Sequence, residues 1–151
     1  MTATHQADVD RLLADVVDRL RQRGGRASAC LRPVLEALVE AGGHRSAEEL
    51  AGEVHARHPE IHQSTVYRNL DRFEQLGVAY HTHLGHGPAL WHLAASSHQH
   101  LTCQQCGAVM VVDPSVFEAL GATLRRQAGF TADFRHFAIT GRCAACADVT
   151  R

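Results

Sequence analysis

Four cysteines near the carboxyl end of the chain are spaced as metal ligands. Cys103 and Cys106 form one C-x-x-C pair, and Cys143 and Cys146 form a second pair further along the chain. Two such pairs can supply the four thiolates of a tetrahedral zinc site, in which the metal neutralises sulfurs that would otherwise repel one another. The sequence therefore predicts a structural zinc site that staples two distant segments together.

The chain also contains twelve histidines, a high count for 151 residues. His98 and His100 alternate just ahead of the first cysteine pair, and His81 and His83 alternate in an earlier segment with strand character. Because residues two apart in a strand project to the same face, each pair can chelate one ion through imidazole nitrogens. We therefore expect more than one metal site.

Composition narrows the class of protein. The sequence has neither an apolar run behind a basic start nor an apolar stretch long enough to span a bilayer, which predicts a cytoplasmic protein without a membrane segment. Thiols stay reduced in the cytosol and the five cysteines are an odd number, so Cys30 is expected to be a small buried hydrophobe rather than half of a disulfide. The formal net charge of -1 gives no overall basic field, but most arginines precede residue 90, where local patches can form.

The first part of the chain has the pattern of a winged helix. Apolar residues recur at helical spacing in four segments, glycines end three of them, and Ser46 with Glu49 forms a capping box at the start of the third. Two segments with β character follow, with a glycine-rich turn between them. The expected apolar helix stripes cover residues 9–20, 31–39, 50–54 and 66–73, and the expected strands cover residues 78–84 and 89–93.

The fourth of these helices is the expected DNA reader. Its exposed amino-terminal face carries Thr65, Tyr67 and Arg68. In the major groove an arginine can pair with guanine or phosphate, and an aromatic ring can contact a thymine methyl group. A solvated helix face is the alternative interpretation of this helix alone, and the wing that follows it favours DNA binding.

The carboxyl-terminal part has a different pattern and predicts a second, smaller domain. After a hinge of small residues we expect strands over 99–102 and 108–112, a helix from Pro114 to about Gln127, and a last strand from Phe134 to Thr140 that delivers Cys143. The fold class is therefore α+β. The expected domains are a winged-helix domain at 1–93, a hinge at 94–97, and an α/β domain with the cysteine site at 98–151.

Three motifs in this order resemble the ferric uptake regulator (Fur) family of bacterial metal-dependent repressors. They are the Ser64–Leu70 run with its T-V-Y-R core, the H-x-H-x-x-C-x-x-C block that ends at Cys106, and the closing G-x-C-x-x-C. The resemblance covers nearly the whole chain and implies a homodimer, in which the carboxyl-terminal domains form the dimerisation core and two DNA-binding domains read a pseudo-palindromic operator in double-stranded DNA. Arg26 stands where the family has a minor-groove or backbone arginine, whereas the arginine of the usual proline-glutamine-arginine step is displaced to Arg32.

The resemblance also implies a regulatory metal site at the hinge. His98 and His100 match two of its ligands, His44 matches a histidine before the third helix, and His92 stands at the end of the wing, where relatives often carry a carboxylate or thiolate. Four imidazoles without a carboxylate favour nickel, zinc or copper over manganese or magnesium. Surface or packing roles are the alternative for His44 and His92.

A second regulatory site is implied by three further histidines, His81, His83 and His136. Most Fur-like chains carry a histidine one residue earlier, where Arg135 stands, and a shift by one residue in a strand turns a side chain to the opposite face. His136 is therefore expected to leave the family's dimer-domain site and to point toward the wing, which leaves Glu118 as a surface carboxylate. This set is most similar to the nickel-responsive, Nur-type branch. His86, at the wing turn, is either a loop residue or an auxiliary ligand.

Together these features predict a repressor of metal-homeostasis genes that binds its operator in response to Ni2+ and holds a structural Zn2+. A zinc-responsive repressor of the same family is the alternative, because zinc accepts the same donors. No enzyme is expected, since a zinc hydrolase needs an arrangement such as H-E-x-x-H and a thiol redox protein uses one C-x-x-C at a helix start. Peroxide sensing in the family needs iron and usually an aspartate ligand, which the candidate ligands lack.

Overall fold

The computed structural model describes residues 3–42, 45–83, 87–96, 99–135 and 138–147. It divides into two compact units, one of Met1–His81 with Leu90–Ser96 and the other of Thr82–Ala89 with Ser97–Arg151. The tip of the wing is thus grouped with the second unit, and the domain boundaries at residues 93 and 98 stay predictions. Across the described ranges, no helix is both long and apolar enough to cross a bilayer.

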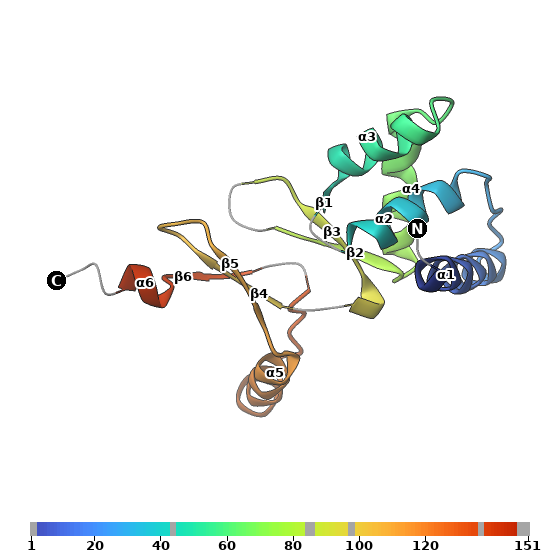
Figure 1. The fold of residues 1–151 in the computed structure, drawn as a ribbon. Coiled ribbons are helices and arrows are strands. Elements are labelled where there is room, and N and C mark those ends of the chain that lie inside the picture. The colour runs from blue at the N-terminus through green and yellow to red at the C-terminus, as the bar shows by residue number, and fades with distance from the viewer. Residues whose placement is uncertain (1–2, 43–44, 84–86, 97–98, 136–137, 148–151) are drawn as a thin grey trace. The chain divides into compact units, whose positions relative to one another are not determined.

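Four helices and a small sheet build the first unit (Figure 1). α2 packs against α1, α3 and α4, because its apolar stripe is buried among them. One continuous hydrophobic core takes in the predicted stripe of every helix, as Val16, Leu35, Leu50 and Phe73 illustrate. The four helices are therefore confirmed, with α1 at Ala3–Gln22, α2 at Leu31–Ala41, α3 at Ala47–Arg57 and α4 at Gln63–Gln75.

Local signals in the sequence set the helix boundaries. Ser46 is the N-cap of α3: its hydroxyl accepts a hydrogen bond from the Glu49 N–H at 3.2 Å, and the Glu49 carboxylate accepts one from the Ser46 N–H at 2.8 Å. The Ser46 backbone N–H, and then its side chain, lower the pKa of Glu49. Gly42 follows α2 and Gly77 follows α4, both at positive φ (62° and 69°), which glycine adopts without steric cost.

The wing sheet has three strands in the order β1-β3-β2. β2 spans Ala79–Thr82, β3 spans Leu90–Leu93, and the two-residue strand β1, Arg45–Ser46, runs antiparallel to β3 with Arg45 opposite Trp91. β1 was not predicted, because two residues carry no periodicity of their own. Helices α2 to α4 followed by this sheet form the winged helix.

The second unit is built on β4 (Gln99–Cys103). β5 (Val109–Val112) pairs with β4 antiparallel, and β6 (Ile139–Gly141) pairs with it parallel, so β4 is the central strand. α5 (Pro114–Ala128) lies beyond one end of this sheet rather than across its face, and the short α6 (Ala144–Ala147) ends the described chain (Figure 1).

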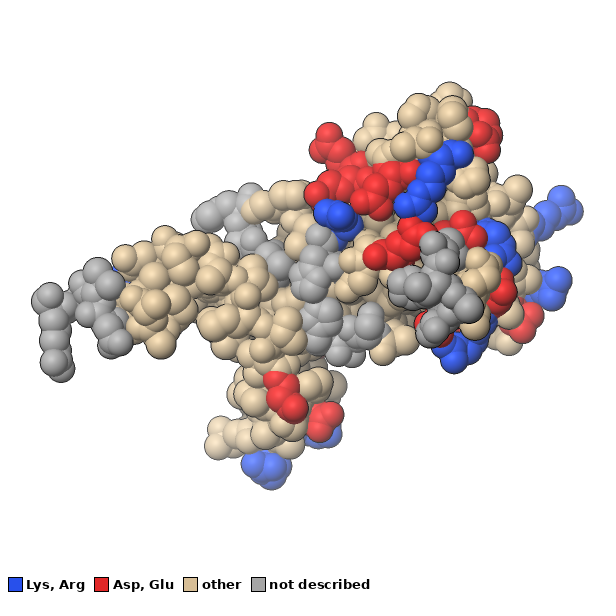
Figure 2. Space-filling model, in the orientation of Figure 1, with Lys and Arg blue, Asp and Glu red and all other residues tan. Residues whose placement is uncertain are grey.

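This second unit has very little hydrophobic core. Cys103 and Phe117 are the buried hydrophobic side chains among its described residues. Large apolar side chains stand exposed instead on β5, α5 and β6, and just after α5: Val109, Met110, Val111, Val116, Leu120, Phe130 and Ile139. Figure 2 shows that the part of the surface formed by its strands is almost free of charged side chains. The unit therefore needs stabilisation from outside its own core.

The last strand is shorter than predicted. β6 begins at Ile139, and Phe134 and Arg135 lie in no strand, so the prediction of a strand from Phe134 was wrong. The Phe134 ring instead packs edge-on against Phe117, with centroids 5.2 Å apart, and a Cβ at Gly121 would lie 3.4 Å from that ring. The predicted orientation of His136 assumed a strand at Arg135, which is not present, and His136 itself lies outside the described residues. In the expected hinge, residues 94–96 form a short 3-10 helix.

We expect Ser46→Ala to destabilise the protein by about 1 kcal/mol, because it removes the N-cap acceptor of α3. The free energy of unfolding in urea measures the loss. Since the pKa of Glu49 is lowered in the folded state, the contribution of its carboxylate is present above the ordinary carboxyl pKa and is lost as the pH falls through the lowered value. The backbone N–H that lowers this pKa most is kept in Ser46→Ala, so both proteins should lose most of the carboxylate contribution in acid, and the difference that comes from the N-cap hydroxyl should persist. Ser64→Ala, at an exposed position of α4, is the control; equal losses for both would contradict the capping role.

Candidate metal and DNA-binding sites

Two turns bring the four cysteines together at one end of the second sheet. Cys103 ends β4, and a turn through Gly107, at a φ of 73°, carries the chain past Cys106 into β5. β6 lies parallel to β4 and leads into Cys143, just before α6, which contains Cys146. The Cys143 N–H donates to Cys103 Sγ at 3.4 Å, so the two segments contact each other directly at the cluster.

The cysteine cluster has the dimensions of a tetrahedral zinc site. All four Sγ atoms lie within 4.8 Å of one another, and the Sγ atoms of Cys106 and Cys143 are 3.8 Å apart. Four sulfurs placed about 2.3 Å from a central Zn2+ are roughly 3.8 Å apart, so this donor set fits the ion. Within the described ranges, this cluster is where three or more histidine, cysteine or acidic side chains converge.

The four thiols differ in how readily they ionise. The backbone N–H of Cys143, followed by those of Cys106 and Gln105, lowers the pKa of Cys103 to about 6. Contacts with Cys143 and Cys106, together with burial and the nearby Cys103, raise the pKa of Cys146 to about 12. A divalent cation binds the thiolate form of every ligand, so its binding to this cluster should release protons.

Two of the four histidines predicted for the hinge site are buried. His92, on β3, stacks on Tyr80 with ring centroids 5.1 Å apart, and His100 lies on β4. A buried imidazole suits an enclosed metal ligand as well as a packed core residue. His92 and His100 belong to different units, and His44 and His98 lie outside the described residues, so the assembly of this site stays a prediction.

Two of the three histidines predicted for the second metal site lie among the described residues. His81, on β2, places Nδ1 2.7 Å from Glu74 Oε1, and His83 is exposed just after the strand. Thr82 stands between them and donates its hydroxyl to the carbonyl oxygen of Arg135 at 2.5 Å. Thr82 is thus bonded to the residue that precedes His136; His136 itself and His86 lie outside the described residues.

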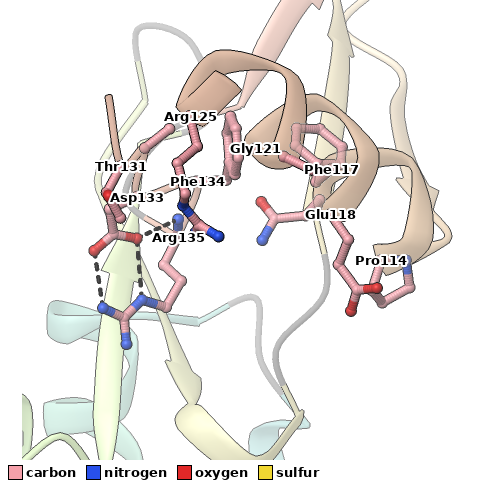
Figure 3. Close-up of a pocket in the computed structure, with 12 residues that line it drawn as sticks. Pro114, Phe117, Glu118, Gly121, Arg125, Thr131, Asp133, Phe134 and Arg135 are labelled. Atoms are coloured by element: carbon pink, nitrogen blue, oxygen red, sulfur yellow. Dashed lines mark hydrogen bonds and ion pairs between the residues drawn. The ribbon is translucent and has the colours of Figure 1, made fainter. Parts of the chain in front are cut away.

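A groove of about 660 Å³ lies between α5 and residues 131–135 (Figure 3). Glu118 and Arg135 both line it, and Arg135 forms an ion pair with Asp133, with Nη2 2.8 Å from Oδ2. A guanidinium group has only donors and cannot ligate a cation. Glu118 therefore gains no metal-binding companion from Arg135, in keeping with its predicted role as a surface carboxylate.

Helix α4 presents the predicted DNA-reading residues. Tyr67 and Arg68 are exposed and Thr65 is half-buried, while the opposite face of the helix, with Val66 and Phe73, is anchored in the core. The Tyr67 hydroxyl accepts a hydrogen bond from Gln63 Nε2 at 2.8 Å. The first half of the helix is therefore free to enter a groove without disturbing the core.

The two candidate arginines outside α4 have different surroundings. Arg26 is exposed in the segment between α1 and α2. Arg32 instead pairs through Nη2 with Asp10 at 2.7 Å and through Nη1 with Glu36 at 3.6 Å. The displaced arginine therefore joins α1 to α2 and is not held out toward solvent as a phosphate contact requires.

Two features escaped prediction from the sequence. Glu74 meets His81 across the short turn that joins α4 to β2, and no periodic spacing pattern signals that contact. Asn69 is buried in α4 and donates from Nδ2 to the carbonyl oxygen of Thr65 at 2.9 Å. The only feature of the sequence that indicated the burial of Asn69 was its position on the apolar side of the helix.

A winged helix with an exposed recognition helix, joined to a strand unit with a four-cysteine metal site, defines a DNA-binding regulator that holds a metal. The order of elements and the ligand set both match one class of bacterial regulator.

The chain belongs to the ferric uptake regulator family, whose family model matches residues 22–139. Its fold is similar to that of the Helicobacter pylori ferric uptake regulator, with a TM-score of 0.72, 20% identity, and coverage of 92% of this chain and 93% of that one. A zinc uptake regulator solved with zinc and DNA has a TM-score of 0.58 at 25% identity, covering 93% and 96%. The peroxide-responsive repressor PerR of Staphylococcus saprophyticus is 23% identical over 140 residues, 93% of this chain and 95% of that protein.

These similarities confirm the predicted fold class, an amino-terminal winged-helix DNA-binding domain with a carboxyl-terminal dimerisation domain. They also place the chain among metal-responsive, DNA-binding transcription regulators, a family that is not one of enzymes.

We expect Cys143→Ala to lose one zinc ion per chain and to lower the melting temperature, because three thiolates no longer close the tetrahedron. Metal content after gel filtration and a thermal melt measure the two effects. Cys30→Ala is the matched control, since Cys30 packs against the core of the first unit and lies outside the cluster. Full zinc content in Cys143→Ala would overturn the assignment of the site.

Proposed function

We propose that this protein is a nickel-responsive repressor of the Nur type, which binds a pseudo-palindromic operator as a cytoplasmic homodimer and controls metal-homeostasis genes. The observation that carries the proposal is the separation of ligand types along the chain. All four sulfurs of the paired cysteines gather in one cluster, and the candidate ligands at the hinge and the wing are histidines. Imidazole sites suit Ni2+, with water completing the coordination.

In the proposed hinge site, His44, His92, His98 and His100 hold the regulatory ion. The burial of His92 and His100 supports this role, because buried imidazole rings are held in fixed orientations. His44 and His92 precede the proposed hinge at 94–97 and His98 and His100 follow it. An ion bound by ligands from both sides of the hinge fixes the orientation of the DNA-binding domain.

In the proposed second site, His81, His83 and His136 bind nickel. His81 and His83 lie on either side of Thr82, whose hydrogen bond to the Arg135 carbonyl oxygen supports placing the residue before His136 close to this end of β2. This contact replaces strand alternation as the reason for grouping the three residues. A metal ion bound by these three histidines would link the wing to the segment that precedes the last strand.

Operator binding is assigned to α4 and to the segment before α2. Arg68 and Tyr67 read base edges or phosphates from the exposed start of α4, Thr65 supports them, and Arg26 contacts the backbone or minor groove. Their exposure supports this assignment. Metal bound by residues on both sides of the hinge favours the arrangement in which two recognition helices reach successive major grooves. The gain in DNA affinity equals the free energy by which the metal prefers that arrangement.

The exposed apolar face of the second unit supports a homodimer. Val109 and Val111 project from one face of β5, and Val116 and Leu120 lie one helical turn apart on α5. A small unit with so little buried apolar surface leaves this face to be covered by a second copy of the chain. The dimer would then place two winged helices on a symmetric operator.

Nickel should strengthen operator binding by the wild-type protein, and His81→Ala should weaken this nickel response by removing one imidazole ligand. Fluorescence anisotropy with a palindromic operator, at buffered free nickel or free zinc, measures both. Arg68→Ala should bind DNA poorly at every metal concentration, with a loss of about 1–3 kcal/mol. His58→Ala, at an exposed turn, is the control and should behave as wild type.

Equal operator affinity with and without nickel would contradict the nickel response. A response confined to free zinc would identify a zinc-responsive repressor, for which the same imidazole donors are suited. An unchanged nickel response in both His81→Ala and His136→Ala would remove the second site from the mechanism.

We expect Val111→Lys to convert the dimer into a monomer, because it places a charge in the apolar face where side chain 111 is 61% exposed. Light scattering coupled to size-exclusion chromatography gives the mass of the assembly. Gln127→Lys adds the same charge at an exposed position of α5 and should leave the dimer intact. A dimer that persists in Val111→Lys would show that another surface forms the interface.

A further inference from the structure

One carboxylate of the recognition helix faces a histidine of the wing. Glu74 lies in the last turn of α4, and its Oε1 is 2.7 Å from Nδ1 of His81 on β2. Both side chains are largely shielded, with exposures of 29% for Glu74 and 31% for His81. The contact lies entirely within the first unit.

A second contact within the first unit is similar in kind but different in setting. His58 Nδ1 is 3.5 Å from Glu60 Oε1, and the Glu60 side chain is 72% exposed. Solvent screens such a surface pair, so it holds neither side chain firmly. The Glu74–His81 contact is shorter and more enclosed, and it fixes the imidazole more strongly.

The contact favours one tautomer of His81. A carboxylate oxygen only accepts hydrogen bonds, so its position 2.7 Å from Nδ1 favours the hydrogen on that nitrogen. In the neutral imidazole the lone pair is then on Nε2. The Trp91 ring lies beside His81, with centroids 5.3 Å apart and planes inclined by 51°, and limits rotation of the imidazole from another side.

We propose that Glu74 is a positioning residue for the wing metal site, holding His81 in the tautomer that offers Nε2 to the ion. The proposal rests on the proposed role of His81 as a ligand. A carboxylate behind a ligating histidine fixes the ring orientation and raises the basicity of the free nitrogen. Because Glu74 belongs to α4, the same contact connects the wing ligand to the end of the DNA-reading helix.

The test combines a metal affinity with a direct reading of the tautomer. In Glu74→Ala we expect nickel affinity at the wing site to fall by about 10–100-fold, measured by competition with a chelator. Glu74→Gln keeps the size and one acceptor oxygen without the charge, and its loss should be smaller. Glu60→Ala is the matched control, because it breaks the exposed His58 contact and should leave nickel affinity unchanged.

The tautomer is read from the imidazole nitrogen shifts in two-bond proton–nitrogen spectra, with His81→Ala assigning the signals. Without added nickel, His81 of the wild-type protein should be protonated at Nδ1, and in Glu74→Ala the proton should move toward Nε2. An unprotonated Nδ1 in the neutral ring of the wild type would overturn the proposal. This reading applies even if a Glu74 variant fails to fold, since it concerns the wild-type protein.

The outcomes separate this inference from the proposed function. If His81→Ala itself leaves nickel affinity unchanged, the wing site is wrong and the role of Glu74 in it fails with the site. If His81→Ala weakens nickel binding while Glu74→Ala binds as tightly as wild type, the site stands and only the positioning role is wrong. Circular dichroism of each variant shows whether a loss of affinity reflects unfolding.

Discussion

The contact between the two C-x-x-C pairs is the interaction on which the carboxyl-terminal unit depends. That unit buries hydrophobic side chains at only Cys103 and Phe117 among its described residues, and one of these two belongs to the four-cysteine cluster. A fold with so little apolar burial does not offset the entropy lost when its chain is ordered. In the proposed assembly, a bound metal links β4 to the segment after β6, and a second copy of the chain covers the exposed valines of β5. Metal and partner would then take the place of the missing core.

The division of ligands by chemistry follows from this structural demand. A metal that holds the fold together must stay bound, and four thiolates in a closed tetrahedron give such a site. A metal that reports its own concentration must come and go, and imidazoles with open positions for water suit that task better. The proposed sensor histidines accordingly stand on the wing and around the hinge. A regulator built this way can lose its signal without losing its fold.

The amino-terminal unit was largely predictable from sequence because its signals are local. The Ser46–Glu49 capping box, the glycines after α2 and α4 and the apolar stripe of α4 each act within a few residues. The last strand was overpredicted because the apolar Phe134 packs on Phe117 from an irregular segment. Glu74 could not be found by spacing, since its contact with His81 depends on the geometry of the short turn between α4 and β2, which no periodic pattern specifies. Arg32 shows the same limit, because its pairing with Asp10 depends on how α1 lies on α2.

We propose that sulfur ligands anchor the fold and that nitrogen ligands sense the metal. X-ray absorption at the zinc and nickel edges of one nickel-loaded sample tests this division most directly. We predict zinc surrounded by four sulfurs at about 2.3 Å, and nickel surrounded by nitrogen and oxygen with an imidazole signature and no sulfur. Sulfur in the first shell of nickel, or imidazole nitrogen in that of zinc, would contradict the division between anchor and sensor.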